Sequence, residues 1–157
     1  MTTPVPQSES PALPELPVTF RPTRTRVVLL TVGAALLAVL VVIAVLLPAL
    51  SPGERLSFVF TGLLFFLVLL LLSRPKVVAD SGGVTVVNLT TRRRLEWAEV
   101  LRVNLRPGDP WVLLDLADGT SLAAMGIQPG IARDQAVRDA RTLRALAEAY
   151  GTGESTV

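Results

Sequence analysis

Three consecutive arginines, Arg92, Arg93 and Arg94, are the residues whose type and spacing most readily suggest a chemical role. A guanidinium cluster attracts anionic lipid headgroups, with about 1 kcal/mol gained per basic residue near the bilayer surface. Successive side chains of a strand alternate between faces, so Arg92 and Arg94 would share one side and Arg93 the other. Alternatively, the arginines are a solvated strand edge whose charge prevents pairing with another sheet. We predict a candidate lipid or partner contact at these residues and leave its role open.

Catalytic chemistry has little material in this sequence. The 157 residues contain no cysteine and no histidine, which excludes thiolate nucleophiles and thiolate or imidazole metal ligands. Asp118 belongs to an Asp-Gly turn, and Glu96 and Glu99 have no base or nucleophile beside them in the sequence. A glycine-rich phosphate loop and a nucleophile elbow are also missing from the sequence. We therefore predict a non-enzymatic protein with no catalytic residues, no metal site and no cofactor.

The basic residues do not indicate nucleic-acid binding. The net charge is +2 although the pI is about 9.9, because 15 basic residues are nearly balanced by 13 acidic ones. Lys76 is the one lysine, and the remaining basic residues are arginines, which together with abundant Ala, Val and Leu indicates a GC-rich coding bias. We predict partners other than nucleic acid.

Two apolar runs dominate the first half of the chain. Residues 27–47 and residues 56–72 contain no charged side chain, and a helix of about 20 apolar residues crosses the hydrocarbon core of a bilayer. The loop 48–55 carries Pro48, Pro52 and Gly53, which end one helix and turn the chain. The first run is too long for the apolar core of a signal peptide, and a second run follows it at once. The sequence predicts two transmembrane helices joined as a hairpin, and hence an integral membrane protein.

The charges beside the two runs predict their orientation. Basic residues cluster before the first run and after the second, whereas the loop between them holds Arg55 beside Glu54. The members of that cluster are Arg21, Arg24, Arg26, Arg74 and Lys76. Because basic flanks remain in the cytoplasm, both termini are expected on the cytoplasmic side of the cell (inner) membrane. Six prolines within residues 1–26 predict a disordered tail, or alternatively a proline-rich ligand segment.

Residues 74–151 have the pattern of a β-rich domain with a final helix, followed by a flexible tail at 152–157. Alternating apolar residues and turn dipeptides predict six short strands in an antiparallel meander. The predicted strands are 77–79, 83–89, 92–97, 101–106, 111–117 and 120–125. In the fourth, Leu101, Val103 and Leu105 are expected to share one face. Trp97 and Trp111 are more simply explained by packing in a small domain than by stacking on a ligand.

The final helix is expected between Pro129, in its first turn, and Gly151, just past its end. Its apolar stripe covers the sheet and comprises Ala136, Ala140, Leu143, Ala147 and Tyr150. The predicted fold class is thus α+β, a two-helix transmembrane hairpin followed by a small antiparallel β-barrel or sheet capped by a C-terminal helix.

This outline, with the motifs DxxGVTV, RRRxxWAEV, DPWxxLxLADG and MxIQ, resembles the bacterial pleckstrin-homology-like (PH-like) domain of the low molecular weight protein antigen 6 family. The resemblance covers roughly residues 74–150, and family members also carry two preceding hydrophobic spans. It implies an actinobacterial membrane protein with a PH-like fold, and implies no particular activity.

Our leading hypothesis is a membrane-anchored PH-like module at the cytoplasmic face that binds an unidentified protein partner or a second copy of itself. The alternative is a domain that senses anionic lipid, or is oriented by it, through the Arg92–Arg94 cluster. The two differ in their expected response to salt, since attraction between exposed charges weakens as ionic strength rises.

Overall fold

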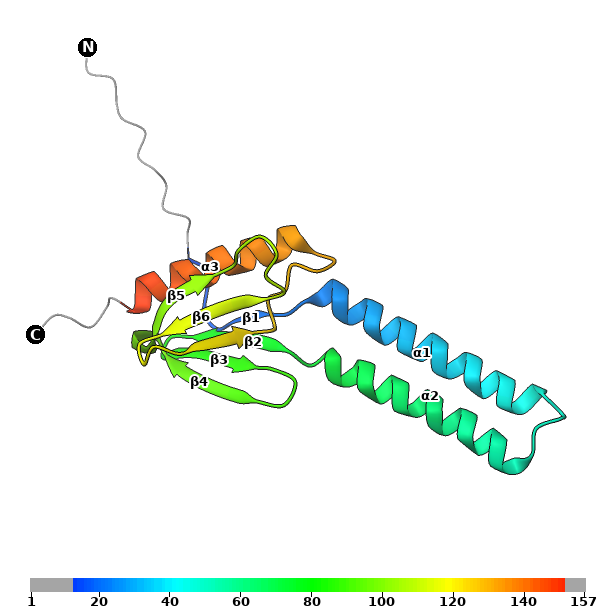
Figure 1. The fold of residues 1–157 in the computed structure, drawn as a ribbon. Helices are drawn as coiled ribbons and strands as arrows, with labels where there is room; N and C mark the ends of the chain where they lie inside the picture. Colours follow the sequence, from blue (N-terminus) through cyan, green and yellow to red (C-terminus); the bar gives the residue numbers. More distant parts are fainter. Residues whose placement is uncertain (1–12, 152–157) are drawn as a thin grey trace, which may run out of the picture.

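The computed structural model describes residues 13–151, so the predicted tail at 152–157 and the first twelve residues lie outside the described part. A long helical hairpin projects from one end of a β-rich domain (Figure 1). Its helices are α1 (Thr23–Leu46) and α2 (Pro52–Leu72), which contain nearly all of the two predicted spans.

Local sequence signals determine where α2 begins. The Ser51 hydroxyl accepts a hydrogen bond from the Glu54 backbone N–H at 3.4 Å, and the Glu54 carboxylate accepts one from the Ser51 N–H at 2.8 Å. This reciprocal capping box satisfies N–H groups that the first helical turn leaves free. Pro52 follows in the first turn, where its missing N–H costs nothing.

The two helices approach each other closely at glycines. A Cβ atom at Gly33 would lie 3.1 Å from the Phe66 side chain, and one at Gly62 would lie 3.0 Å from the Leu37 side chain. Small residues at such contacts allow apolar helices to pack in a bilayer.

The remaining faces of the hairpin are apolar and uncovered. Only 11% of the most apolar stretch of α1 and 6% of that of α2 is buried. A hairpin inside a soluble core would instead be mostly buried. Both helices are long and apolar enough to cross a membrane, and their exposed surface favours association with lipid.

A short strand precedes the hairpin, where the sequence predicted a disordered tail up to residue 26. Strand β1 (Val18–Phe20) pairs antiparallel with β2 (Lys76–Asp80), placing Val18 opposite Ala79 and Phe20 opposite Val77. Phe20 is only 4% exposed and belongs to the core of the domain. Its burial explains why the segment is ordered despite its prolines. The hairpin is therefore inserted between two paired strands, and both of its ends join the domain.

Within residues 13–151, the β-rich domain contains seven strands in two sheets. The first has the order β1-β2-β3-β4, and the second has the order β5-β6-β7. The bounds after β2 are β3 Gly83–Val87, β4 Arg92–Glu96, β5 Val100–Asn104, β6 Val112–Leu116 and β7 Ser121–Ala124. A 3₁₀ turn at Trp97–Glu99 separates β4 from β5, so the predicted single meander is divided there. The α+β class is confirmed, and the described strands form two open sheets instead of a closed barrel.

Helix α3 (Arg133–Gly151) covers the core (Figure 1). Its Leu143 and Leu146 are fully buried, in one cluster with Leu95 and Leu114 from the two sheets. The predicted stripe is correct at Ala136, Ala140 and Leu143, whereas Tyr150 is 41% exposed. The helix begins at Arg133, four residues later than the predicted first turn at Pro129.

Strand β5 contains a β-bulge that changes the predicted alternation. The register with β6 shifts between Val100, which faces Leu116, and Arg102, which faces Asp115. A bulge adds one unpaired residue and reverses the side-chain direction after it. Val100 and Val103 are therefore buried, and Leu101, predicted on the same face as Val103, is 64% exposed.

The side chain of Asn88 connects the two sheets just beyond the end of β3. Its amide nitrogen donates to the Ala123 carbonyl at 2.8 Å, and its amide oxygen accepts from the Met125 backbone N–H at 3.1 Å. Asn88 is 9% exposed, so these bonds replace water at an otherwise unsatisfied amide.

Candidate interaction surfaces

The predicted arginine cluster occupies β4, the last strand of the first sheet. All three side chains are exposed, and they pair in register with Val87, Val86 and Thr85 of β3. Since β4 has a strand neighbour on one side only within the described chain, its charges also protect a free sheet edge.

Two of the three arginines interact with carboxylates of the same domain. Arg94 donates two hydrogen bonds to Asp80, at 2.7 and 2.9 Å, and these bonds are the main reason that the pKa of Asp80 is lowered and that of Arg94 is raised. Arg93 lies 3.6 Å from Asp118, whose pKa is lowered mainly by a hydrogen bond from Thr120. Arg92 is in neither ion pair. The cluster therefore presents less uncompensated charge than its sequence indicates.

The ion pair with Asp80 makes a pH-dependent contribution to stability. Because the folded-state pKa of Asp80 lies below its ordinary value of 3.8, the stabilisation is fully present above about pH 4 and is lost as the pH falls through the folded-state value. We expect Arg94→Gln to lower the melting temperature of the full-length protein at pH 7 and to lower it less at pH 3, below the ordinary pKa of Asp80. Thermal unfolding at both pH values, with Arg92→Gln as control, measures this, and equal losses at both would contradict it.

Trp97 is a packing residue, as predicted. Its indole nitrogen donates to the Asp80 carbonyl at 2.9 Å, its ring stacks on Tyr150 with centroids 6.0 Å apart, and it is 4% exposed. Trp111 lies just before β6 and is partly buried. The stacked Tyr150 ring thus covers the indole at the end of α3.

Two acidic side chains of the second sheet, Asp118 and Asp115, have structural partners. Asp118 accepts hydrogen bonds from the backbone and hydroxyl of Thr120 in the β6–β7 turn. Asp115 accepts from Asn104 and from Ser121, which join the three strands of the second sheet. Within residues 13–151, three or more potential metal ligands do not come together anywhere.

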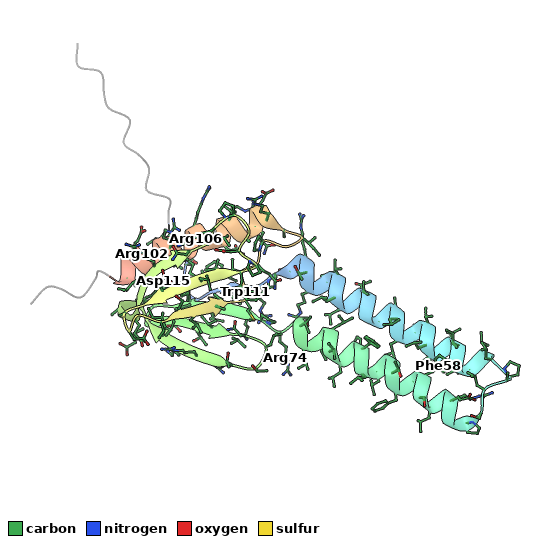
Figure 2. The ribbon with its side chains drawn as sticks, in the orientation of Figure 1. Phe58, Arg74, Arg102, Arg106, Trp111 and Asp115 are labelled. Atoms are coloured by element: carbon green, nitrogen blue, oxygen red, sulfur yellow. The ribbon has the colours of Figure 1, made fainter. Side chains whose placement is uncertain are left out.

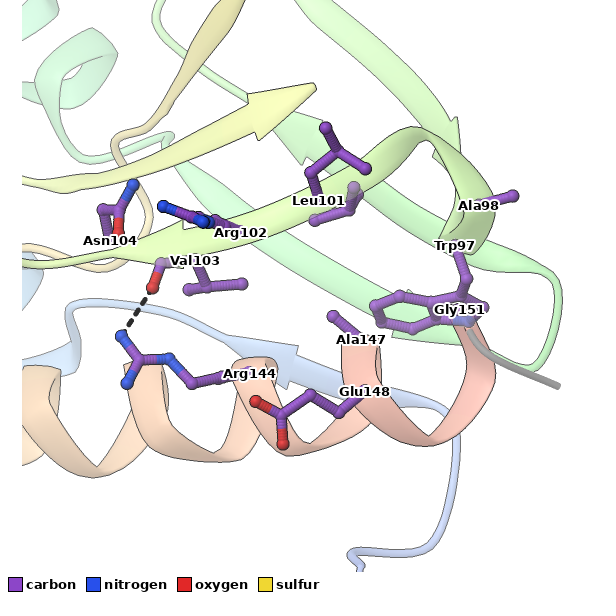
Figure 3. A pocket seen from close by; sticks show the side chains of 11 residues that line it. Trp97, Ala98, Leu101, Arg102, Val103, Asn104, Arg144, Ala147, Glu148 and Gly151 are labelled. Carbon is purple, nitrogen blue, oxygen red and sulfur yellow. Dashed lines mark hydrogen bonds between the residues drawn. The ribbon is translucent and has the colours of Figure 1, made fainter. Parts of the chain in front are cut away.

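A groove that sequence analysis did not predict runs between β5 and α3 (Figure 3). It has a volume of about 350 Å³ and is lined by Trp97 and β5 on one side and by the last turns of α3 on the other. Exposed Leu101 lies at its rim, and Arg144 donates from α3 to the Val103 carbonyl at 2.7 Å. Strand β5 is the first of its sheet, so its outer edge faces this groove.

The sequence pattern does not predict the groove, because the groove depends on the bulge in β5. The plain alternation of residues 101–106 places Leu101 inside, and only the register shift brings it to the surface beside α3.

Comparisons with known proteins agree with this geometry. Residues 74–146 match the family described as bacterial PH domain. Uncharacterized proteins of Mycobacterium bovis and Mycobacterium tuberculosis are 36% identical to this chain over 89 residues, which is 57% of this chain and 57% of each relative. The aligned part thus spans little more than half the length of these relatives, and no solved structure matches. Over residues 74–146, which hold β2 to β7 and most of α3, this chain is therefore similar to the bacterial PH domain family.

Proposed function

We propose that this protein is a non-enzymatic, membrane-anchored PH-like interaction module whose domain lies at the cytoplasmic face and binds a protein partner or a second copy of itself. The observation that carries the proposal is the groove between β5 and α3, where a strand edge and the exposed Leu101 side chain lie beside an open hollow.

The charge distribution supports the cytoplasmic placement. The basic residues that flank the hairpin lie at the end adjoining the domain, as Arg74 does in Figure 2. At the far end, the Arg55 side chain donates hydrogen bonds to the carbonyls of Leu47 and Leu50. This cation therefore stabilises the loop between α1 and α2. Positively charged flanks are retained in the cytoplasm, and the domain is retained with them.

The groove is suited to an extended segment of a partner. A peptide that runs beside the outer edge of β5 would pair with its backbone and place an apolar side chain near Leu101 and Trp97, as in strand-addition binding. Arg144 covers the Val103 carbonyl, so binding along the whole edge requires Arg144 to move. Tethering by two helices keeps the groove near the membrane surface, which raises its effective concentration for membrane-associated partners.

Site-specific photo-crosslinking in intact cells tests this proposal. A photoreactive amino acid at position 102 is expected to give one discrete adduct, which is lost when Leu101→Asp is added because a carboxylate at the rim opposes apolar contact. Ser81→Asp, in the exposed turn between β2 and β3, is the matched control and should leave the adduct unchanged. An adduct of twice the mass of the chain would identify the partner as a second copy. An adduct insensitive to Leu101→Asp would contradict use of the groove.

Anionic lipid remains the second candidate ligand. Exposure of Arg92, Arg93 and Arg94 on β4 supports it, whereas the ion pairs of Arg93 and Arg94 reduce the charge available there. A stronger observation in favour of lipid lies elsewhere, where the hairpin joins the domain.

A further inference from the structure

A basic cavity lies at the junction of the hairpin and the β-rich domain. It has a volume of about 410 Å³, and four of its lining residues are cations: Arg21, Arg26, Arg74 and Lys76. Arg21 follows β1, Arg26 lies in the first turns of α1, Arg74 follows α2, and Lys76 begins β2. The β1–β2 pairing and the hairpin thus bring together cations from both connections between the hairpin and the domain. Figure 2 labels Arg74 at this junction.

The junction cavity has no internal counter-charge. Its other lining residues are Leu70, Ser73 and Val87, and none of the seven is acidic. The salt bridges found within residues 13–151 involve Arg93 and Arg94 and none of the four junction cations. Four close cations repel one another, and an anion held among them lowers that repulsion.

The position of the cavity corresponds to the depth of lipid headgroups. Leu70 lies in the last turn of α2, and Ser73 follows the helix where the apolar run ends. The Ser73 hydroxyl donates a hydrogen bond to the Leu70 carbonyl at 2.7 Å. A ligand at this level therefore has cations around its charged end and an apolar helix surface beside the rest of it. An amphiphile with an anionic head meets both conditions, whereas a soluble anion meets only the first.

We propose that the junction cavity binds the phosphate headgroup of an anionic phospholipid from the cytoplasmic leaflet. The inference rests on the proposed membrane crossing by α1 and α2, and it assigns the lipid to a site other than Arg92–Arg94. Arg26 and Arg74 belong to the hairpin ends, whereas Arg21 and Lys76 adjoin the paired strands β1 and β2. One bound headgroup would therefore hold the domain at a fixed angle to the bilayer, with the groove between β5 and α3 at a defined height above it.

Native mass spectrometry of the full-length protein released from mixed-lipid nanodiscs tests the site. With phosphatidylglycerol and phosphatidylcholine of identical acyl chains, wild type should retain one phosphatidylglycerol in preference to phosphatidylcholine. The double variant Arg74→Gln, Lys76→Gln should lower this preference about tenfold or more, because each basic residue near the surface contributes to anionic lipid binding. The matched control is Arg24→Gln, Arg92→Gln, which removes the same charge from residues outside the cavity and should change the preference little.

A second variant separates loss of the site from loss of folding or orientation. Val87→Glu leaves every cation in place and adds a carboxylate to the cavity lining, so it should also abolish the preference for phosphatidylglycerol. Fluorescence of Trp97 and Trp111, both in the β-rich domain, reports whether each variant is folded.

Several results would overturn the proposal. These are equal retention of the two lipids by wild type, an equal loss in the Arg24, Arg92 control, or unchanged retention in folded Val87→Glu. Complete displacement by glycerol phosphate at the concentration of the lipid would show a site for soluble phosphate and would also refute a lipid site. By contrast, failure of wild type to enter nanodiscs at all would refute the proposed membrane crossing.

Discussion

Replacing Gly83 with alanine is expected to unfold the β-rich domain or to destabilise it by more than about 3 kcal/mol. Gly83 has a φ angle of 155°, and a Cβ atom there would lie 2.1 Å from the Leu95 carbonyl oxygen. The obstacle is backbone of the adjacent strand β4, which cannot rotate away as a side chain would. The substitution therefore breaks the pairing of β3 with β4 at the start of the strand.

Two other glycines provide graded controls. Gly119 has a φ angle of 81° with nothing within 4 Å of its added Cβ atom, so alanine there should cost about 1–2 kcal/mol from backbone strain alone. A Cβ atom added at Gly130 would have nothing within 4 Å, and its φ angle is not left-handed. Alanine at this position should therefore change the stability very little. Both tryptophans lie in the β-rich domain, and their fluorescence during denaturant unfolding in nanodiscs reports its stability. A Gly83→Ala protein as stable as Gly130→Ala would contradict the close approach of β3 and β4.

The second large effect is expected at Asn88, whose amide bridges the two sheets. Asn88→Asp at neutral pH replaces the donor to the Ala123 carbonyl with a charged oxygen at a buried position. The hydrogen bond to Ala123 is lost, the new carboxylate repels the Ala123 carbonyl oxygen, and the charge is removed from water. Together these effects should lower the free energy of unfolding by more than about 3 kcal/mol. Asn88→Ala, which leaves the same carbonyl unpaired without adding a charge, should cost about 1–3 kcal/mol.

The pH dependence of Asn88→Asp distinguishes charge burial from loss of packing. Burial should raise the pKa of the new carboxyl in the folded state, so the destabilisation should be absent below its unfolded-state pKa near 3.9 and grow as the pH rises above it. The protonated acid can still donate to Ala123 and accept from Met125. Denaturant unfolding followed by tryptophan fluorescence at pH 4 and pH 7 gives the free energy of unfolding of the variant and of wild type. A loss of stability that is equal at the two pH values would argue against the hydrogen bonds from Asn88 to the second sheet.

The insertion of the hairpin within the domain has a mechanical consequence. Because β1 and β2 are paired and continue into α1 and α2 after two and three residues respectively, both helices enter the domain side by side. A single flexible linker would let the domain reorient above the membrane, whereas two closely spaced connections restrict that motion. This restriction would give the groove and the proposed lipid site a fixed relation to the bilayer.

Periodicity was sufficient to predict the helices, six of the strands and the fold class. The apolar runs of the hairpin and the alternation in residues such as Val77 and Val84 are local signals, and each was correctly assigned to a helix or a strand. Burial of Trp97 was also predicted, since a large apolar side chain at a strand end of a small domain usually packs.

Strand β1 was not predicted because its stabilisation is non-local. The three residues of β1, which lie between Pro17 and Pro22, are too few to show a periodic pattern. The strand is held by β2, which lies more than fifty residues later. Phe20 is the single large aromatic side chain in that strand, and its burial depends on the hairpin returning the chain to the same place.

The division into two sheets and the bulge at Leu101 were also missed. Both depend on how strands pair after the 3₁₀ turn at Trp97–Glu99, which local alternation does not encode. The groove beside β5 follows from these two irregularities, so it could not be derived from spacing.

The candidate sites also depend on contacts between residues that are distant in the sequence. The arginine triplet is conspicuous in the sequence, yet its partners are Asp80 at the end of β2 and Asp118 in the β6–β7 turn. Only the folded sheets bring these carboxylates near the arginines. The cations of the junction cavity were recognised as orientation signals, whereas their convergence around one hollow required the pairing of β1 with β2.

Labelling of introduced cysteines in intact cells tests the central claim most directly, since the natural chain contains none. Ala49→Cys lies in the loop between α1 and α2, and Ser81→Cys lies in the exposed turn between β2 and β3. We predict that a membrane-impermeant maleimide modifies position 49 in intact cells and position 81 only after lysis. Modification at position 81 in intact cells, or protection of position 49 until lysis, would contradict a hairpin that crosses the membrane twice and leaves the domain in the cytoplasm.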